Sequence, residues 1–316
     1  MRALVTGGAG FIGSHLTEAL IQGGHDVLVL DDLSRGKAAN VPAGARLVTE
    51  DLRSEAARSA IQAFRPEVVH HHAAQIDVRA SVADPVRDAE VNVAGTISVL
   101  AAAAGAGAGL IVFASSGGAI YGEQERYPAS EDHPIRAESP YGVAKRCGEL
   151  YLEYFARSRG LRAVMLRYAN VYGPRQDPHG EAGVVAIFAG KMLRGEIPVV
   201  NGDGCQTRDY VYVGDVVRAN LACIARGEAS GPYNIGTGIE TDVLTLVRRI
   251  AEHTGHSGQV QHAPAKPGEQ RRSVLDPARA RAELGWSPAH DLSEGLARTI
   301  AWFSAGGGRT PGASAG

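Results

Sequence analysis

The sequence contains few cysteines, few lysines, no long apolar run and almost no net charge. Its three cysteines, Cys147, Cys205 and Cys223, lack CxxC spacing and therefore indicate neither a disulfide framework nor a zinc site. No stretch approaches the ~18 apolar residues of a membrane span, so a membrane partner is not expected. A formal net charge of -2, with both signs interspersed, also argues against a nucleic-acid partner.

What remains points to chemistry on a small molecule. Met1 leads directly into a strand-like apolar run without the pattern of a signal peptide, so we expect a cytoplasmic protein. At 316 residues the chain can bury a large core and form two domains or one large α/β unit. Only four lysines stand against 28 arginines, a bias that makes each lysine worth examining.

The pattern of apolar residues predicts an α/β fold. Short β-rich runs alternate with longer helical patterns, as in βαβ units built on a parallel sheet. Strands are expected at residues 2–6, 26–31, 45–49, 67–72, 109–114 and 161–168. Helices are expected between them at 12–23, 54–64, 82–105 and 140–159. We therefore predict a Rossmann-type, doubly wound parallel sheet.

Beyond residue 170 this regular alternation ends. Loops rich in Gly and Pro separate shorter helices, expected at 182–194, 214–226, 241–254, 277–284 and 292–304. The change predicts a Rossmann-type domain over residues 1–170 and a smaller α/β domain over 171–305, interleaved with the first. Residues 306–316, rich in Gly, Ser and Ala, are expected to form a disordered tail.

A glycine-rich turn, VTGGAGFIG, follows the first strand at residues 5–13. In its GxxGxxG spacing, Gly7 allows the turn, Gly10 lets backbone approach a pyrophosphate, and Gly13 lets the helix pack on the strand. Asp31 ends the second strand, where an acid meets the adenosine ribose of a dinucleotide. A carboxylate there would repel a 2′-phosphate, which favours NAD over NADP, although the neighbouring Arg35 leaves NADP open.

One of the four lysines follows a tyrosine at helical spacing in SPYGVAK, residues 139–145. Pro140 suits the first turn of a helix, and Lys145 shares a face with Tyr141, one turn earlier. A cation beside a phenol favours the phenolate, so we expect the pKa of Tyr141 to fall from about 10 towards neutrality. The pair would form a general base; the alternative is an ordinary contact on an exposed helix.

Together these motifs resemble the extended short-chain dehydrogenase/reductase family, and within it the nucleotide-sugar 4-epimerases. The resemblance covers about residues 1–305 and rests on GGAGFIGSH (7–15), LDDLSRG (30–36), HAAQIDVRAS (72–81), NVAGT (92–96), FASSGGAIYG (113–122), SPYGVAKRCGE (139–149), RYANVYGPRQ (167–176), RDYVYVGDV (208–216), YNIGTG (233–238) and PGEQRRSVLD (267–276). It implies reversible inversion at sugar C4 between UDP-glucose and UDP-galactose, through a 4-keto intermediate and with tightly bound NAD.

The resemblance also implies roles for individual residues. Tyr141 would remove the proton of the 4-hydroxyl, while Lys145 bridges to the nicotinamide ribose and keeps Tyr141 ionised. Asp51 and Leu52 would suit the adenine edge, an ordinary strand-end Asp being the alternative. The residues expected at the cofactor are Gly7, Gly10, Phe11, Ile12, Gly13, Asp31, Asp32, Asp51, Leu52, His72, Ala73, Ala74, Gln75, Asn92, Tyr141, Lys145 and Tyr168.

A second set of residues is expected at the UDP-sugar: Ser116, Gly117, Asn170, Val184, Val200, Asn201, Arg208, Arg271 and Ser273. Arg208 and Arg271 would clamp the diphosphate; surface salt bridges are the alternative, and Arg272 competes with its neighbour. Ser273 is small, so UDP-N-acetylhexosamines could fit as well. The helices expected at 82–105 and 140–159 resemble those that pair in family homodimers, while an internal helix packed on the sheet is the alternative.

The stretch FASSGGAIYG departs from the family pattern. Relatives carry Ser or Thr four residues before its tyrosine, and here that position is Gly117. We expect Ser116 to supply the catalytic hydroxyl, because glycines at 117 and 118 remove side chains that would block it and allow unusual backbone angles. The alternatives are that Tyr141 works without a hydroxyl partner, or that the serines only satisfy backbone groups.

The same stretch separates related reactions. Nucleotide-sugar 4,6-dehydratases place an Asp-Glu pair after the hydroxyl, and decarboxylating relatives use a Glu there, because those reactions need a further acid or base. This chain has Gly118 and Ala119, so simple epimerisation is favoured. A UDP-glucuronate 4-epimerase, with Arg79 at the carboxylate, and a net NAD-dependent dehydrogenase or reductase remain alternatives.

Three consecutive histidines, His70, His71 and His72, end the fourth expected strand. Successive side chains on a strand point to opposite faces, so the three rings cannot all bind one metal ion. We expect packing roles and a cofactor contact from the last of them, and no metal site.

Overall fold

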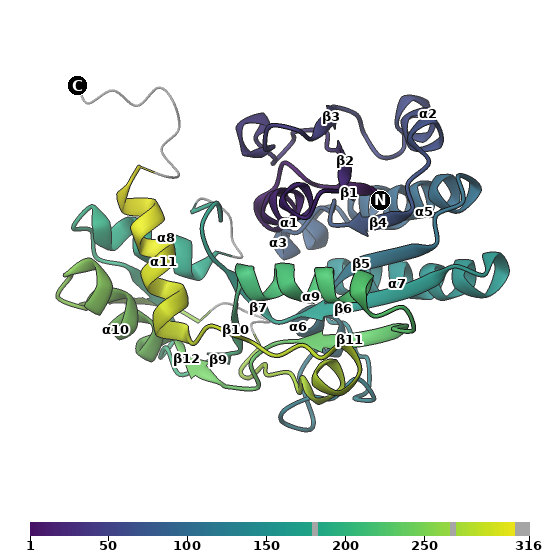
Figure 1. The fold of residues 1–316 in the computed structure, drawn as a ribbon. Coiled ribbons are helices and arrows are strands. Elements are labelled where there is room, and N and C mark those ends of the chain that lie inside the picture. Colours follow the sequence, from purple (N-terminus) through teal and green to yellow (C-terminus); the bar gives the residue numbers. More distant parts are fainter. Residues whose placement is uncertain (179–182, 266–269, 307–316) are drawn as a thin grey trace.

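The computed structural model describes residues 1–178, 183–265 and 270–306. Its main feature is a parallel sheet of seven strands in the order β11-β6-β5-β4-β1-β2-β3 (Figure 1). The strands are β1 (Arg2–Thr6), β2 (Asp26–Leu30), β3 (Arg46–Val48), β4 (Val68–His71), β5 (Leu110–Ser116), β6 (Arg162–Tyr168) and β11 (Gly231–Ile235). The prediction of a Rossmann-type doubly wound sheet is confirmed.

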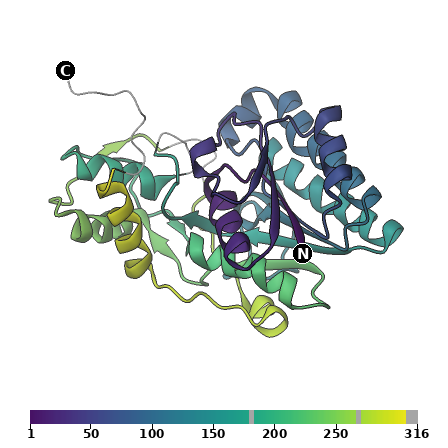
Figure 2. The ribbon, with the colours of Figure 1, turned by 45° about the horizontal axis from the view of Figure 1, so that its top comes forward.

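Helices cover both faces of this sheet, and each face has its own apolar core (Figures 1 and 2). On one face, α1 (Phe11–Gln22) packs against α9 (Val213–Ala225). On the other, α2 (Glu55–Phe64) and α7 (Pro140–Arg159) both pack against α5 (Gly95–Gly105). The alternation of a strand explains the two cores, because Ala3 and Val5 of β1 face the first and Leu4 the second.

Two differences from the sequence prediction concern the large sheet and the helices beside it. The helix expected at 82–105 is divided into α3 (Val78–Ala83), α4 (Pro85–Ala89), a π-helical turn (Glu90–Ala94) and α5. The break occurs because Pro85 opens a new helix and the Asp84 side chain accepts the backbone N–H of Arg87 at 3.0 Å. Strand β11 was not predicted, since its sequence, GPYNI, begins with two residues that disfavour strands.

The remaining elements lie mostly beside the large sheet, on the left in Figure 1. A third apolar core joins α8 (Val184–Leu193), α10 (Val243–Thr254) and α11 (Leu292–Ser304). Three two-stranded sheets pair β7 (Asn170–Tyr172) with β10 (Tyr210–Tyr212), β9 (Thr207–Arg208) with β12 (Thr241–Asp242), and β8 (Val199–Asn201) with β13 (Gln261–Ala263). The shorter helices are η1 (Ala38–Asn40), α6 (Gly117–Tyr121) and the π-helical turn η3 (Ala280–Leu284).

Two further sequence predictions concern membrane-spanning helices and the C-terminal tail. Within the described ranges, none of the helices combines the length and apolarity needed to cross a bilayer. The predicted disordered tail covers residues 306–316, of which all but Gly306 lie outside the described residues.

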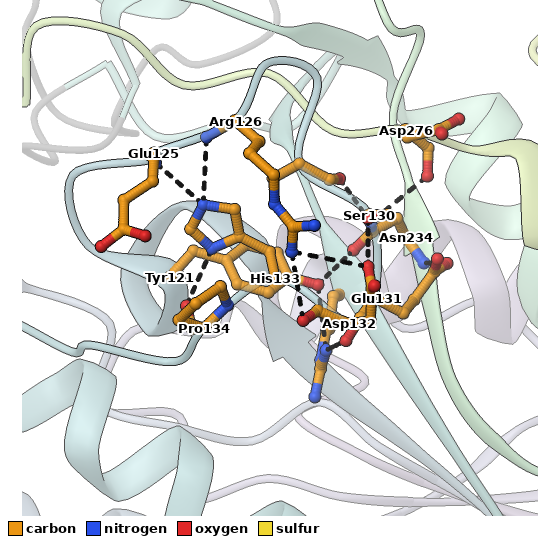
Figure 3. A network of polar contacts seen from close by, with 12 residues as sticks. Tyr121, Glu125, Arg126, Ser130, Glu131, Asp132, His133, Pro134, Asn234 and Asp276 are labelled. Atoms are coloured by element: carbon orange, nitrogen blue, oxygen red, sulfur yellow. Dashed lines mark hydrogen bonds and ion pairs between the residues drawn. The ribbon is translucent and has the colours of Figure 1, made fainter.

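The loop between α6 and α7, residues 122–139, is cross-linked by its own polar side chains (Figure 3). His133 is buried, and its Nε2 accepts the backbone N–H groups of Glu125 at 2.9 Å and Arg126 at 3.4 Å. The Glu131 carboxylate accepts the N–H of Asn234 on β11 at 2.7 Å. These contacts fix the chain that leads into the first turn of α7, which carries Tyr141.

Candidate active site

The glycine-rich turn joins β1 to α1 and leaves the start of the helix open. Gly7 has a left-handed φ of 69°, and a Cβ there would lie 2.7 Å from the Ala73 nitrogen. A Cβ on Gly13 would lie 2.2 Å from the Gly7 oxygen, so helix and turn touch directly. The N-cap residue is Gly10, which has no side chain to accept the N–H groups of the first turn. The N–H groups at this helix start therefore suit a phosphate.

Asp31 lies beside this turn, at the end of β2. Its carboxylate accepts the N–H of Ala9 and the N–H of Leu33, each at 2.9 Å, and the side chain is buried. Burial raises the pKa of Asp31, while the two backbone hydrogen bonds oppose that rise. Arg35, the residue that kept NADP as an alternative cofactor, lies 3.7 Å from the Asp77 carboxylate. Asp32 is exposed, and its carboxylate accepts hydrogen bonds from the N–H and the hydroxyl of Ser34.

The expected adenine residues lie near the end of β3. Arg53 pairs with Asp51 at 2.7 Å, and its hydrogen bonds hold the pKa of that carboxyl below its usual range. Leu52 is buried in the second core, close to Gly95 at the start of α5. Asp51 thus already has a cationic partner, which sequence spacing did not indicate.

The three histidines at the end of β4 take different partners. His70 Nδ1 lies 3.1 Å from Asn220 Oδ1, and His71 lies between the hydroxyls of Thr6 and Thr96 at 2.7 and 2.9 Å. His72 stacks on Tyr168, with Nε2 3.2 Å from the phenol oxygen. Among the described residues, no group of His, Cys, Asp or Glu is arranged to hold a metal ion.

The loop after β4 is held by a polar cluster that sequence analysis did not identify. The Gln75 N–H donates to Asn92 Oδ1 at 2.8 Å, and Asn92 Nδ2 donates to the Gln75 carbonyl at 2.8 Å. Both side chains also donate to Asp88 Oδ1, at 3.0 and 2.9 Å. Asn92, expected at the cofactor, therefore positions the loop of Ala73, Ala74 and Gln75 through its side chain.

Tyr141 and Lys145 lie on the first turns of α7, as the sequence predicted. Ser139 caps the helix through Gly142 N, and Lys145 Nζ donates to the Ala114 carbonyl of β5 at 2.8 Å. Lys145 Nζ lies 5.7 Å from the centre of the Tyr141 ring. No described residue forms a hydrogen bond with the Tyr141 hydroxyl, so this group is free for a substrate.

The expected lowering of the pKa of Tyr141 is wrong for the protein alone. Burial raises the pKa of Tyr141, and the Asp88 carboxylate raises it further. Burial also lowers the pKa of Lys145 to about 8, although Asp88 and Glu149 oppose this effect. The physical reason is that desolvation outweighs the attraction between an ammonium and a phenol that are not in direct contact.

The two serines at the end of β5, Ser115 and Ser116, have different hydrogen-bond partners. Ser115 donates to the buried Glu149 at 2.7 Å, so it belongs to the packing behind the strand. Ser116 is the N-cap of α6 and accepts the Ala119 N–H at 3.4 Å, a long bond. Its hydroxyl proton has no acceptor among the described residues. Of the two serines, only Ser116 keeps a free donor.

The structure shows why residue 117 is a glycine, which the sequence analysis missed. A Cβ at this position would lie 2.6 and 2.8 Å from the two terminal methyl carbons of Leu275, which is fully buried. Neither Gly117 nor Gly118 has a positive φ, so the expected use of unusual backbone angles is wrong. At Gly118 the nearest atom to a Cβ is Ser273 Oγ at 3.6 Å, which leaves room for a methyl group.

A buried ion pair supports the strand end from behind. Arg167 on β6 contacts both oxygens of Glu149 at 2.9 and 2.8 Å and donates to the Tyr121 hydroxyl at 2.9 Å. Burial alone would raise the pKa of Glu149, but the Arg167 hydrogen bonds and charge hold it below its usual range. Sequence analysis missed this pair, although a lone arginine within the apolar run AVMLRY was an available signal.

The other expected substrate residues come from β7, α8, β8, β9 and residues 271–273. Asn170 and Val184 line one small hollow of about 10 Å³, which is room for a single water molecule. Arg208 donates to the Thr207 carbonyl at 2.7 Å. Val200 is buried in the third core, which argues against a direct substrate contact, and Asn201 ends β8 with its carbonyl accepting Gln206.

Arg271 and Arg272 differ in their partners. Arg272 makes two hydrogen bonds to Glu240, at 2.6 and 3.1 Å, and lies 3.8 Å over the Tyr127 ring. Arg271 has a looser contact, 3.5 Å from Asp203, and its side chain is 69% exposed. Arg271 therefore needs less rearrangement to meet a diphosphate. Ser273 is buried, and its carbonyl accepts the Asp209 N–H at 2.9 Å.

The open helix start, the acid at β2 and the small residues around the turn fit a dinucleotide laid across the sheet. The tyrosine and lysine beside it define an enzyme of the extended short-chain dehydrogenase/reductase class. The chain belongs to the NAD dependent epimerase/dehydratase family, whose family model matches residues 3–236.

Individual relatives are similar over nearly the whole chain. A curated protein of Methanocaldococcus jannaschii named "Putative UDP-glucose 4-epimerase" is 47% identical over 95% of this chain and 97% of its own length. The structure of a Thermotoga maritima UDP-glucose 4-epimerase with UDP-glucose has a TM-score of 0.94 and 47% identity, covering 97% of this chain and 99% of that one. A Thermus thermophilus UDP-glucose 4-epimerase in complex with NAD has a TM-score of 0.91 and 48% identity, covering 96% and 99%.

Proposed function

We propose that this protein is an NAD-dependent UDP-glucose 4-epimerase that interconverts UDP-glucose and UDP-galactose. The observation that carries the proposal is the Tyr141 hydroxyl, without a hydrogen-bond partner among the described residues, near a buried lysine and a strand end with no carboxylate. Gly118 and Ala119 stand where a dehydratase would need an acid and a base. The names of the similar proteins support the same activity.

In this proposal the chain binds the cofactor through the start of α1, the Asp31 carboxylate and the loop at Ala73 and Ala74. NAD held there would supply reversible hydride transfer at sugar C4 and a positive charge that favours the Tyr141 phenolate. The Tyr141 oxygen takes the proton of the 4-hydroxyl and gives it back. Lys145 remains cationic and stabilises the phenolate, while Ser116 donates its free hydroxyl proton to the same sugar oxygen.

The nucleotide half of the substrate is assigned to the second part of the chain, residues 171–305, and to Asn170. We assign the diphosphate to Arg208 and Arg271, because a guanidinium can donate two parallel hydrogen bonds to phosphate oxygens. Arg272 is left out because Glu240 and Tyr127 already hold its guanidinium.

The first experiment is to incubate the purified protein with UDP-galactose, without added NAD, and to follow the anomeric signals by NMR. Conversion towards a UDP-glucose-rich mixture, with no net change in absorbance at 340 nm, is the expected result. Stoichiometric production of NADH once NAD is added would indicate a net dehydrogenase instead. Turnover of UDP-galacturonate or UDP-N-acetylgalactosamine, but not of UDP-galactose, would reassign the sugar.

We also propose that the protein is a homodimer that pairs through α7 and the helices beside it. One side of α7 exposes four apolar residues at helical spacing: Val143, Leu150, Tyr151 and Tyr154. Val82 and Val86, 62% and 68% exposed, lie on α3 and α4, which pack against α7. A second copy of this face would cover these side chains.

Light scattering after gel filtration tests the dimer. We expect twice the chain mass for the unmodified protein and a monomer for Leu150→Glu/Tyr154→Glu, since two carboxylates would enter an apolar contact. Lys191→Glu, a charge change on α8 away from this face, is the control. A monomeric unmodified protein at micromolar concentration would contradict the proposal. Location in the cytoplasm stays a prediction, which fractionation of the source cells would test.

A further inference from the structure

Asp88 is a buried carboxylate that the expected chemistry does not use. It lies on α4 and is 2% exposed. Oδ1 accepts hydrogen bonds from Gln75 and Asn92, whereas Oδ2 is buried without a hydrogen-bond partner among the residues that the structure describes. A buried carboxylate oxygen without a partner is costly, so an opposite charge nearby is needed to stabilise it.

The buried cation on the neighbouring helix α7 is Lys145. Helix α4 packs against α7. Burial raises the pKa of Asp88, while its hydrogen bonds to Gln75 and Asn92 and the charge of Lys145 oppose that rise. In return, the Asp88 charge raises the pKa of Lys145. Lys145 is 5% exposed and donates to a single carbonyl, that of Ala114. Glu149, the other carboxylate near Lys145, is held by both Arg167 and Arg146. Asp88 is therefore the carboxylate near Lys145 that no arginine neutralises among the described ion pairs.

We propose that Asp88 is a positioning residue that keeps Lys145 cationic beside Tyr141 and connects that charge to the loop held by Gln75 and Asn92. This inference rests on the proposed function only in taking Tyr141 and Lys145 as the catalytic pair. The same carboxylate thus contacts the cofactor loop through hydrogen bonds and the catalytic lysine through charge.

The charges around Lys145 and Tyr141 determine in which direction their pKa values change when Asp88 loses its charge. The titratable groups that face Lys145 are Asp88 on α4, Tyr141 and Glu149 on α7, and His71 and His72 at β4. Asp88 raises the pKa of Lys145 against the effect of burial, and it raises the pKa of Tyr141 in addition to the effect of burial. Removing its charge therefore lowers the pKa of both groups.

The scarcity of lysines makes a direct measurement possible. Carbon-13 labelling of lysine gives four side-chain signals, and Lys145→Arg identifies the one from Lys145. We expect Asp88→Asn, which keeps an acceptor for Gln75 and Asn92, to lower the titration midpoint of Lys145 by about one pH unit. Asp88→Glu, which restores the charge, should bring the midpoint back towards its original value.

The matched control is Glu90→Gln, an exposed carboxylate on the neighbouring turn that pairs with Arg53. It should leave the Lys145 midpoint unchanged. An unchanged midpoint in folded Asp88→Asn, or an equal shift in Glu90→Gln, would overturn the inference. Thermal melting confirms that each variant is folded; if Asp88→Asn is not, Asp88→Glu and Asp88→Ser replace it in the same comparison.

Turnover then separates this inference from the proposed function. If UDP-galactose is the substrate, both limbs of the kcat profile against pH should move to lower pH in Asp88→Asn, because both pKa values fall. A purely structural role would lower kcat without moving both limbs in one direction, and that result overturns the inference. A shifted Lys145 signal with no turnover of UDP-galactose supports Asp88 and contradicts the proposed function.

Discussion

At the scale of single residues, Gly117 shows how a position expected to serve catalysis can be set by packing. A side chain at 117 would overlap the methyl groups of Leu275. We therefore expect Gly117→Ser, which restores the family hydroxyl, to lower the free energy of unfolding by about 1–3 kcal/mol. Urea denaturation measures this cost.

The double variant tests the cause. Leu275→Ala removes the methyl groups that cause the overlap, so Gly117→Ser/Leu275→Ala should be more stable than the sum of the two single changes predicts. Gly118→Ala is the control, because a Cβ there has room. Additive costs in the double variant would show that Leu275 is not the reason for the glycine.

Tyr141 gives the second prediction at this scale. Tyr141→Phe removes the hydroxyl alone, and no described residue bonds to that hydroxyl, so the melting temperature should stay nearly the same. The kcat on UDP-galactose should fall by about 10²–10⁴ if Tyr141 is the general base. Steady-state assays and a melting curve on one preparation check both statements, and Tyr151→Phe, on the exposed side of α7, is the control.

Much of the site follows from the sequence because its motifs are local. The glycine turn, Asp31 and the Tyr141–Lys145 pair each lie within a few residues of a strand end or a helix start, where spacing determines position. Asp88 and Leu275 were missed because their roles depend on contacts across the fold: Leu275 lies 158 positions from Gly117. No sequence period connects such residues.

At the scale of elements, β5, β6 and α7 depend on one buried ion pair. Glu149→Gln would leave the Arg167 guanidinium buried without a counter-charge, so we expect a loss of about 3–5 kcal/mol in the free energy of unfolding. The control is Glu252→Gln, which breaks an exposed pair with Arg249 and should cost less than about 1 kcal/mol. Equal losses in the two variants would contradict a structural role for the buried pair.

Elements with strong periodicity were predicted well. Helices α7 and α11 have the expected bounds, and strands β1, β2, β4 and β6 differ from expectation by at most one residue at each end. The division of the helix at 82–105 was missed because Asp84 and Pro85 act together: the proline starts one helix while the aspartate caps it. The alanine-rich composition of the segment hid that boundary.

At the scale of the whole molecule, buried histidines determine how stability responds to pH. Burial lowers the pKa of His70 to about 4 and that of His71 to about 3. Below pH 6.5 the unfolded chain binds protons at these sites and the folded protein does not. The free energy of unfolding therefore decreases as the pH is lowered from about 6.5 to 4. His70 and His71 together predict a loss of about 2–3 kcal/mol between pH 7.5 and 5.5, and His72, whose pKa burial lowers well below its usual value, adds to that loss.

Urea unfolding at pH 7.5, 6.5 and 5.5 measures this dependence. His70→Gln should reduce the loss by about 1–1.5 kcal/mol, because one of the titrating histidines is gone. His262→Gln, a change at an exposed histidine, should leave the loss as it is. Equal losses in His70→Gln and the unmodified protein would show that His70 does not contribute to the acid sensitivity.

Leu275 packs against Gly117 but follows it by 158 positions, so it is synthesised much later. Strand β11 completes the large sheet once residue 235 has been synthesised, but Leu275 follows 40 residues later. At 5–20 residues per second, a ribosome needs about 2–8 s to cover that interval. During that interval β11 has been made and Leu275 has not, so the buried contact at Gly117 is among the last parts of the site that the nascent chain can complete.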